Sequence, residues 1–205
     1  YAAVDRGGEY EKVTVDAAWA NLPDDEKTES KAPEFVENVV KVINAQAGDD
    51  LPVSAFSGIE DGTWPAGTAK YEKRGVSAFV PVWNSENCIQ CNKCAYVCPH
   101  AAIRPFVLTP DEMAKAPFGE NGTIPAIGKT FTDMRFIQAV DVLDCLGCGN
   151  CVDVCPGKKG EKALAMAPLD TQLAEQEVFN YGRTLDEKPE VLEKFKAGTV
   201  KGSQF

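Results

Sequence analysis

The eight cysteines of this sequence fall in two short runs with the same spacing. Both runs follow the pattern C-x2-C-x2-C-x3-C-P, the first ending at Cys98-Pro99 and the second at Cys155-Pro156. Thiolates at this spacing are the ligands with which bacterial proteins hold a pair of [4Fe–4S] clusters. The repeat therefore predicts a duplicated unit that binds two such clusters and passes electrons through them one at a time.

The spacing also predicts how the ligands are shared. Two-residue gaps let a tight loop present three thiolates to one iron–sulfur cube, while the fourth cysteine of the run turns toward the other cube. The first cluster is expected to take Cys88, Cys91, Cys94 and Cys155. The second cluster is expected to take Cys145, Cys148, Cys151 and Cys98. No catalytic side chain is expected.

Prolines and glycines next to the cysteines suit this arrangement. Pro99 and Pro156 fix φ just after the fourth cysteine of each run, where the chain must change direction. Gly147 and Gly149 permit unusual backbone angles and a close approach of amide groups to the sulfurs. Such N–H···S hydrogen bonds raise the reduction potential of a cluster.

Three other interpretations of the cysteines fit their spacing less well. Zinc also binds four cysteines, but its sites pair two C-x2-C elements across a longer spacer. Disulfide partners are usually scattered along a secreted chain, whereas these cysteines are dense. A lone cluster can be a purely structural staple, but two interleaved clusters favour electron transfer between them.

The composition excludes several classes of function. The chain of 205 residues has a formal net charge of −10, and nucleic acid is not expected as a partner because phosphate binding needs a basic face. No apolar run reaches the roughly 18 residues of a membrane helix, and no export signal is visible at the start. There is no phosphate-binding glycine loop and no histidine pair with a carboxylate. We expect a cytoplasmic protein with no membrane partner.

Some polar side chains near the cysteines invite a functional role. His100 follows the first Cys-Pro pair and is expected to be an ordinary exposed or hydrogen-bonded histidine rather than a modulator of a cluster or a proton. Lys158, Lys159 and Lys162 follow the last cysteine. A solvated loop is the simpler interpretation of these lysines, and a docking patch for an acidic electron carrier is the alternative.

The segment before the cysteines is mixed. Residues 13–15 predict a short strand, and Asp16 the cap of a short helix that carries Trp19. Residues 24–31 predict a solvated linker. A helix is predicted from Pro33 until Gly48 stops it, with an apolar face made of Val36, Val39, Val40 and Ile43.

Irregular and extended structure is expected up to the second cysteine run. Residues 51–70 are rich in glycine and proline and predict turns, and the alternating apolar residues at 76–82 predict a strand. Thr109 begins a capped helix, and residues 134–142 predict a strand that leads to Cys145. After the second run, helices are predicted near 171–179 and at 189–197, the latter closed by Gly198.

These patterns together predict an α+β protein with a ferredoxin-like two-cluster domain. The domain is expected at residues 84–168, with a large insertion at about 106–133 that covers one face. Residues 1–83 form an N-terminal α/β and irregular segment, and residues 169–205 form a helical connector toward a further domain. The polar start without Met and the absence of a strong stop at the end are expected of a piece of a longer chain.

Further short motifs lie on the flanks of the cysteine runs. They are Leu51-Pro52-Val53-Ser54-Ala55-Phe56, Asp61-Gly62-Thr63-Trp64-Pro65-Ala66-Gly67-Thr68, Tyr71-Glu72-Lys73-Arg74-Gly75, His100-Ala101-Ala102-Ile103-Arg104-Pro105 and Lys201-Gly202-Ser203-Gln204-Phe205. With the cysteine runs, they resemble single-chain pyruvate:ferredoxin (flavodoxin) oxidoreductases. Glu72-Lys73-Arg74 resembles the element for which the EKR region of that family is named, and the similarity extends from about residue 33 onward.

The resemblance implies a part in pyruvate oxidation. Enzymes of that family convert pyruvate and coenzyme A to acetyl-CoA and CO2 on thiamine diphosphate with Mg2+, and pass electrons along three [4Fe–4S] clusters to ferredoxin or flavodoxin. This chain would supply two of those clusters inside a homodimeric enzyme, next to the remaining domains. It has no match to the thiamine diphosphate site, so the segment alone should not turn over pyruvate.

Three functional hypotheses remain open at this point. The chain is an electron-relay segment of a pyruvate or other 2-oxoacid oxidoreductase, a free-standing two-cluster carrier, or an adaptor whose clusters are staples. The long flanks and the insertion favour the first. For Glu72, Lys73 and Arg74, a charged surface turn or a structural salt bridge is the expected role, and no catalytic function is assigned.

Overall fold

The computed structural model describes residues 1–22, 32–196, 198–199 and 202. Contacts within the chain divide it into two compact units, Tyr1–Tyr71 and Glu72–Phe205, and each is described by itself. The division precedes the expected boundary at residue 83, because strand β1 (Phe79–Trp83) pairs with β5 (Leu164–Pro168) of the second unit. The Glu-Lys-Arg element therefore folds with the cysteines, and the other domain boundaries stay predictions.

The first unit begins with little regular structure. After α1 (Ala2–Asp5), a 3-10 helix at Ala17–Asn21 is capped as predicted, because the Asp16 carboxylate accepts a hydrogen bond from the Ala18 amide at 2.9 Å. The strand predicted at residues 13–15 is wrong. Its valines are more than half exposed, and within the part of the chain that the structure describes no strand pairs with this segment. The linker predicted at residues 24–31 lies outside the described residues.

The predicted helix after Pro33 is present but shorter than expected. A π-helical turn, Val36–Val40, continues into α2 (Lys41–Asn44). The three valines of the turn are buried as predicted, whereas Ile43 is 39% exposed. The helix ends before Gly48, because Gln46 already adopts the left-handed conformation with φ of 62°. The next residues form isolated 3-10 turns at Val53–Phe56 and Thr68–Tyr71, which confirms the predicted irregular structure.

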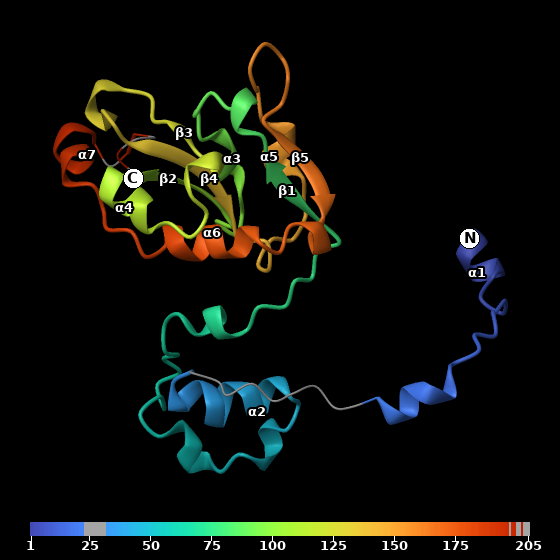
Figure 1. Cartoon of the computed structure of the whole chain (residues 1–205). Helices are drawn as coiled ribbons and strands as arrows, with labels where there is room; N and C mark the ends of the chain where they lie inside the picture. Colours follow the sequence, from blue (N-terminus) through green and yellow to red (C-terminus); the bar gives the residue numbers. More distant parts are fainter. Residues whose placement is uncertain (23–31, 197, 200–201, 203–205) are drawn as a thin grey trace. The chain divides into compact units, whose positions relative to one another are not determined.

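In the described part of the second unit, five strands form two small antiparallel sheets (Figure 1). Besides β1 and β5, the strands are β2 (Ile103–Leu108), β3 (Ile124–Pro125) and β4 (Arg135–Val140). One sheet pairs β1 with β5, and the other has the order β2-β4-β3. β1 starts later than predicted, since Val76 is 63% exposed and unpaired in either sheet. Helices and separate antiparallel sheets confirm the α+β class.

The second unit repeats a strand–helix–strand motif. β1, α3 (Lys93–Val97) and β2 form the first half, and β4, α5 (Asn150–Asp153) and β5 form the second. The outer strands β1 and β5 pair with each other, the inner strands β2 and β4 pair with each other, and α3 packs against α5. Both pairings use the same register: Trp83 lies opposite Leu164, and Val140 lies opposite Ile103. The sequence repeat is thus also a structural repeat.

The predicted insertion lies between β2 and β4. Its helix α4 (Pro110–Lys115) opens with the expected cap: the Thr109 hydroxyl accepts from the Glu112 amide at 3.3 Å, and the Glu112 carboxylate accepts from the Thr109 amide at 2.7 Å. β3 extends the sheet beside β4. α4 packs on β2 and α6 (Glu175–Gly182) packs on β4, so helices cover this sheet (Figure 1).

The C-terminal helices are displaced from their predicted positions. α6 starts after the expected residue 171, because Leu169–Thr171 forms a 3-10 turn. α7 (Pro189–Lys194) begins at proline as predicted but ends earlier, and Ala197 of the predicted helix lies outside the described residues. Lys188, at the start of α7, is buried and donates to Glu112 of α4 at 2.7 Å. Among the described residues, no helix has both the length and the apolar character needed to cross a membrane.

Replacing Gly182 with alanine should destabilise the second unit. A Cβ at this position would lie 2.4 Å from the ring of Phe106, which packs edge-on against Phe179 in the core. We expect the loss in the free energy of unfolding to be about 1–3 kcal/mol, measured by urea denaturation with circular dichroism. The control is Gly198→Ala, where a Cβ would meet nothing within 4 Å. Equal stability of the two variants would contradict the close packing of α6 on β2.

Candidate metal centres

The first cysteine run lies on a short loop between β1 and α3. A 3-10 turn at Ser85–Asn87, capped by the Asn84 side chain, delivers the chain to Cys88. The loop then reaches Asn92, which adopts the left-handed conformation with φ of 57° at the N-terminus of α3. Helix α3 carries Cys94 and ends just before Cys98. The helix therefore separates the fourth cysteine of the run from the first three.

The second cysteine run has the same shape and uses glycine at its bends. Gly147 and Gly149 both have positive φ, 65° and 78°, as the sequence predicts. A Cβ on Gly147 would lie 2.6 Å from the carbonyl oxygen of Phe79, so no other residue fits between this loop and β1. Gly149 precedes α5, which carries Cys151, and Cys155 follows the helix.

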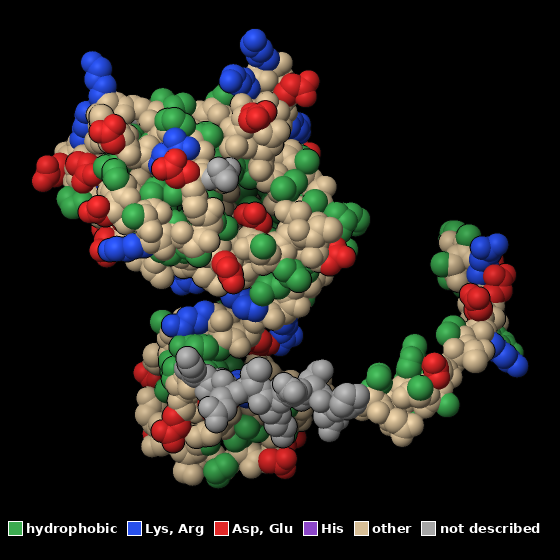
Figure 2. Space-filling model, in the orientation of Figure 1, with side chains coloured by type: hydrophobic (Ala, Val, Ile, Leu, Met, Phe, Trp, Pro, Cys, Tyr) green, Lys and Arg blue, Asp and Glu red, His purple; other side chains and the backbone are tan. Residues whose placement is uncertain are grey.

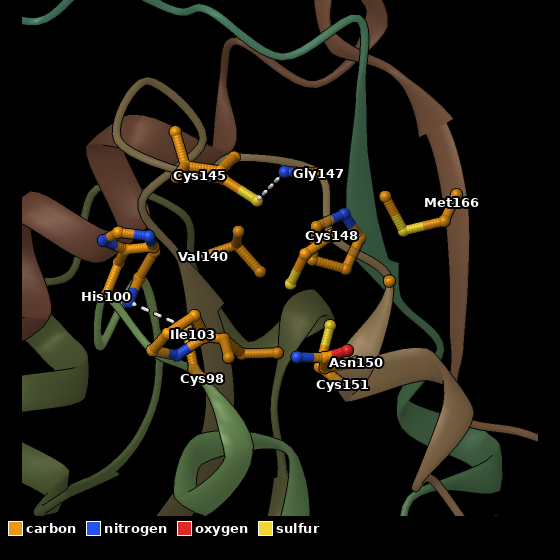
Figure 3. A pocket seen from close by; sticks show the side chains of 15 residues that line it. Cys98, His100, Ile103, Val140, Cys145, Gly147, Cys148, Asn150, Cys151 and Met166 are labelled. Atoms are coloured by element: carbon orange, nitrogen blue, oxygen red, sulfur yellow. Dashed lines mark hydrogen bonds between the residues drawn. The ribbon is translucent and has the colours of Figure 1, made fainter.

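Two hollows lie beside the paired helices, and each is lined by four cysteines. The cysteines that line the first are Cys88, Cys91, Cys94 and Cys155. Those that line the second are Cys98, Cys145, Cys148 and Cys151. Figure 3 shows the sulfur-bearing side chains of the second hollow converging from the second run and from Cys98 of the first. Each hollow thus receives three thiols from one run and one from the other.

Backbone amides donate to the sulfurs in a matching way in both hollows. The amides of Gln90 and Gly147 each donate at 3.4 Å to the first cysteine of their run. The amides of Ala102 and Ala163 each donate at 3.3 Å to the last cysteine, Cys98 and Cys155 respectively. These four bonds are charge-assisted once the sulfurs are thiolates, so both hollows are built to hold sulfur ligands with negative charge.

Burial shifts the ionisation of the thiols. Loss of hydration raises the pKa of Cys94 to about 12 and that of Cys151 to about 11. The pKa values of Cys88 and Cys145 are also raised by burial, and the amides that donate to their sulfurs oppose the shift. Charge on Cys151 raises the pKa of Cys94 across the α3–α5 contact, so the two hollows lie close enough to influence one another.

The chemistry of these donors fits iron–sulfur clusters better than the other candidates. All eight cysteines are free thiols, so none is committed to a disulfide. Among the described residues, no group of three or more His, Cys, Asp or Glu side chains is arranged to hold a single metal ion. Four thiols spread around a hollow are the ligand set that a polynuclear cluster requires.

Polar groups that the sequence analysis did not single out line the first hollow. Asn92 and Gln138 each have a buried side-chain nitrogen with no hydrogen-bond partner among the described residues, and the buried Nε1 of Trp83 has none there except the sulfur of Cys88. Comparing the two halves of the repeat residue by residue would have revealed them, since the second half differs at the matching positions. His100 lines the second hollow and is exposed, in agreement with the expected ordinary histidine (Figure 3).

Lys73 of the Glu-Lys-Arg element binds the turn before the second cysteine run. Its ammonium group donates to the Asp141 carboxylate at 2.7 Å and also to the Asp144 carboxylate. The Asp141 side chain is 5% exposed, and these hydrogen bonds and charges raise the pKa of Lys73 against the effect of its burial. The Cys145 amide donates to the Asp141 carbonyl at 3.0 Å. Lys73 therefore forms the structural salt bridge expected for this element, whereas Arg74 is exposed and pairs with Glu72.

The lysines after Cys155 have unequal surroundings. The Lys162 ammonium donates to the carbonyls of Val152 and Asp153 at 2.6 and 3.2 Å, at the C-terminal end of α5. Lys158 and Lys159 are exposed on the loop between α5 and β5, where basic and acidic side chains stand out together (Figure 2). Lys162 has a structural role, and docking at the other two lysines stays a hypothesis.

Comparison with known proteins identifies what the chain is similar to. Residues 80–156 match a family described as a 4Fe-4S dicluster domain, and residues 23–77 match EKR, described as a domain of unknown function. The chain is 49% identical over its whole length to the pyruvate:ferredoxin oxidoreductase of Moorella thermoacetica. It is 48% identical over 99% of its length to the pyruvate-flavodoxin oxidoreductase of Enterobacter agglomerans. The chain spans 17% of the length of each.

A further relative has a different acceptor in its name. The mitochondrial pyruvate dehydrogenase [NADP(+)] of Euglena gracilis is 37% identical over 99% of the chain, which spans 11% of that protein. The predicted resemblance to pyruvate:ferredoxin and pyruvate-flavodoxin oxidoreductases is confirmed, as similarity to one segment of these long enzymes.

Replacing Lys73 with methionine should destabilise the second unit by about 3 kcal/mol, because Asp141 is left as a buried charge without its partner. Guanidinium unfolding of the chain measures the loss. Arg74→Met is the matched control in the same element, and its exposed pair should contribute less than about 1 kcal/mol. Equal free energies of unfolding of the two variants would show that the Lys73 salt bridge contributes no more to stability than the exposed pair of Arg74.

Bound iron should be lost as the pH falls. Each cysteine that binds a cluster has released its thiol proton. Because burial raises the thiol pKa values, that proton returns readily on acidification. Iron retained against a chelator should therefore decrease steadily from about pH 9 to about pH 6, measured by colorimetric iron assay on the reconstituted chain. Retention that does not depend on pH would contradict thiolate ligation.

Proposed function

We propose that this chain is the electron-relay segment of a 2-oxoacid oxidoreductase and holds two [4Fe–4S] clusters. Cluster 1 is bound by Cys88, Cys91, Cys94 and Cys155. Cluster 2 is bound by Cys98, Cys145, Cys148 and Cys151. The observation that carries the proposal is the sharing of thiols: each hollow takes three sulfurs from one run and the fourth from the other, as in two-cluster ferredoxins.

The residues around the clusters hold the ligands and exclude water. Each bound cluster supplies a one-electron couple. The amides of Gln90, Ala102, Gly147 and Ala163 fix the orientation of four sulfurs and offset negative charge on them. Buried side chains of both halves, among them Val80, Val140 and Leu164, fill the core against which the cysteines pack. This apolar core keeps solvent from the path between the two sites.

The proposed fold is a two-cluster ferredoxin-like domain enlarged by an insertion. The two strand–helix–strand halves with crossed strand pairing support this description, and the segment with α4 and β3 is the insertion. The match of residues 80–156 to a dicluster domain supports it further. α6 and α7 belong to the proposed connector toward a further domain.

The parent reaction we propose is the oxidation of pyruvate with coenzyme A. The names of the relatives support pyruvate as substrate and ferredoxin or flavodoxin as acceptor. Thiamine diphosphate, Mg2+, the third cluster and the contacts of a homodimer would be supplied by parts of the enzyme outside this chain, in the cytoplasm. The Euglena gracilis relative is named for NADP(+), which supports the view that this relay segment does not choose the acceptor.

Serine substitutions at the two exchanged cysteines should damage opposite clusters. In the shared arrangement, Cys155→Ser should reproduce the defect of Cys88→Ser, and Cys98→Ser should reproduce that of Cys145→Ser, because each pair serves one cluster. The measurement is anaerobic reconstitution, iron and sulfide analysis, and EPR of the reduced chain. If Cys155→Ser instead matched Cys145→Ser, each run would bind its own cluster and the sharing would be wrong.

A further inference from the structure

The two hollows differ in the side chains that could donate hydrogen bonds to a bound group. The first hollow is lined by Trp83, Asn92 and Gln138. The side-chain nitrogens of Asn92 and Gln138 have no partner among the described residues, and Trp83 Nε1 has none there except the sulfur of Cys88. Asn92 is 2% exposed and Gln138 is 3% exposed, so bulk solvent does not reach either side chain. Buried donors without protein partners are rare, and several around one hollow indicate a ligand with several acceptors.

The matching positions around the second hollow carry no side-chain donor. When Cys88 is aligned with Cys145, Trp83 corresponds to Val140, Asn92 to Gly149 and Gln138 to Pro81. All three counterparts line the second hollow. Val140 and Gly149 come from the same half of the repeat as most cysteines of the second hollow, as Trp83 and Asn92 do for the first hollow. Pro81 comes from the first half but lines the second hollow, just as Gln138 comes from the second half but lines the first.

Backbone hydrogen bonds do not create this difference. The amide donors of Gln90 and Gly147 are equivalent and lie at the same distance, 3.4 Å, from their sulfurs. The amides of Ala102 and Ala163 are equivalent in the same way, at 3.3 Å. The asymmetry between the hollows therefore comes from the three side chains.

We propose that cluster 1 has the higher reduction potential because Trp83, Asn92 and Gln138 donate hydrogen bonds to its sulfurs. Donors to the sulfurs stabilise the more negative, reduced cluster and raise its potential. The inference rests on the proposed function, since it assigns an order to the two clusters of the relay.

The transfer that follows from this order is balanced. One electron leaves reduced cluster 2, which is oxidised by one electron, and enters oxidised cluster 1, which is reduced by one; no proton and no bond is exchanged. The electron then resides mainly on cluster 1. In the singly reduced segment, cluster 1 is consequently the reduced cluster and cluster 2 the oxidised one.

Other groups near the second hollow also act on the reduction potential of cluster 2. His100 and Asn150 line it but are exposed, so water competes for their N–H groups. Cys148 is exposed, and solvent at its sulfur acts in the opposite direction to the proposed order. The Asp141 carboxylate lies near Cys145, but its ion pair with Lys73 balances its charge, so it does not decide the order of the two clusters.

The test compares donor removal at cluster 1 with donor addition at cluster 2. Gln138→Met and Trp83→Phe keep the approximate shape of the side chain and remove the N–H group. Gly149→Asn adds a side-chain amide at the position that matches Asn92, where φ is 78° and no atom lies within 4 Å of a new Cβ. The reconstituted chain is titrated anaerobically, and the two reduction steps are followed by EPR together with iron and sulfide content.

The wild-type chain should reduce in two steps. Each donor removal should lower the reduction potential of the higher-potential step alone. It should shift the distribution of the electron from cluster 1 toward cluster 2 by about fivefold. Gly149→Asn should raise the lower step alone. If Gln138→Met and Trp83→Phe bind both clusters fully but leave the upper step unchanged, or if Gly149→Asn raises the upper step, the proposed order is wrong. A wild-type chain that binds zinc or lacks sulfide would refute the proposed function instead.

Discussion

The structure depends on the exchange of one thiol between its two halves. A loop with two-residue gaps can present three sulfurs to one site, and the short helix that follows carries the fourth sulfur away from it. Each hollow is therefore complete only when the other half is folded beside it. The pairing of β1 with β5 and of β2 with β4 in a single register brings this about. In the proposed holoprotein, the clusters and the strand pairs consequently stabilise the same arrangement.

The acidic turn before the second run is the point where charge must be balanced. Asp141 is buried, and its backbone carbonyl accepts the Cys145 amide, so the position of its carboxylate is fixed by the loop that presents the thiols. Lys73 neutralises it from a segment that precedes β1. Glu72, Lys73 and Arg74 are thus part of the unit with the cysteines, and Lys73 supports the second hollow.

The repeat preserves the features that hold sulfur and varies those that tune it. Cysteines, backbone donors and strand register agree in the two halves, whereas Trp83, Asn92 and Gln138 have apolar or glycine counterparts. Two identical sites would share an electron equally. Unequal side chains at equivalent positions give one cluster a higher reduction potential without disturbing the ligand geometry. In this way a duplicated fold can set the direction of electron transfer between its two sites.

Local sequence determined the features that depend on near neighbours. The grouping of the cysteines, the caps at Asp16 and Thr109, and the positive φ angles of Gly147 and Gly149 follow from spacing and residue type, because each involves residues a few positions apart. The repeat also predicts the sharing of thiols between the clusters, and the linings of the two hollows support that proposal. By contrast, residues 13–15 have the composition of a strand but pair with no strand among the described residues, so local propensity was misleading there.

Tertiary structure alone decided which distant residues meet. Lys73 reaches Asp141, and Gln138 lines the hollow of the opposite run, only because the strands pair across the repeat. Periodicity and spacing describe a residue relative to its neighbours in the chain. Contacts between residues far apart in sequence, and the burial that leaves a nitrogen without a partner, arise from packing between the halves.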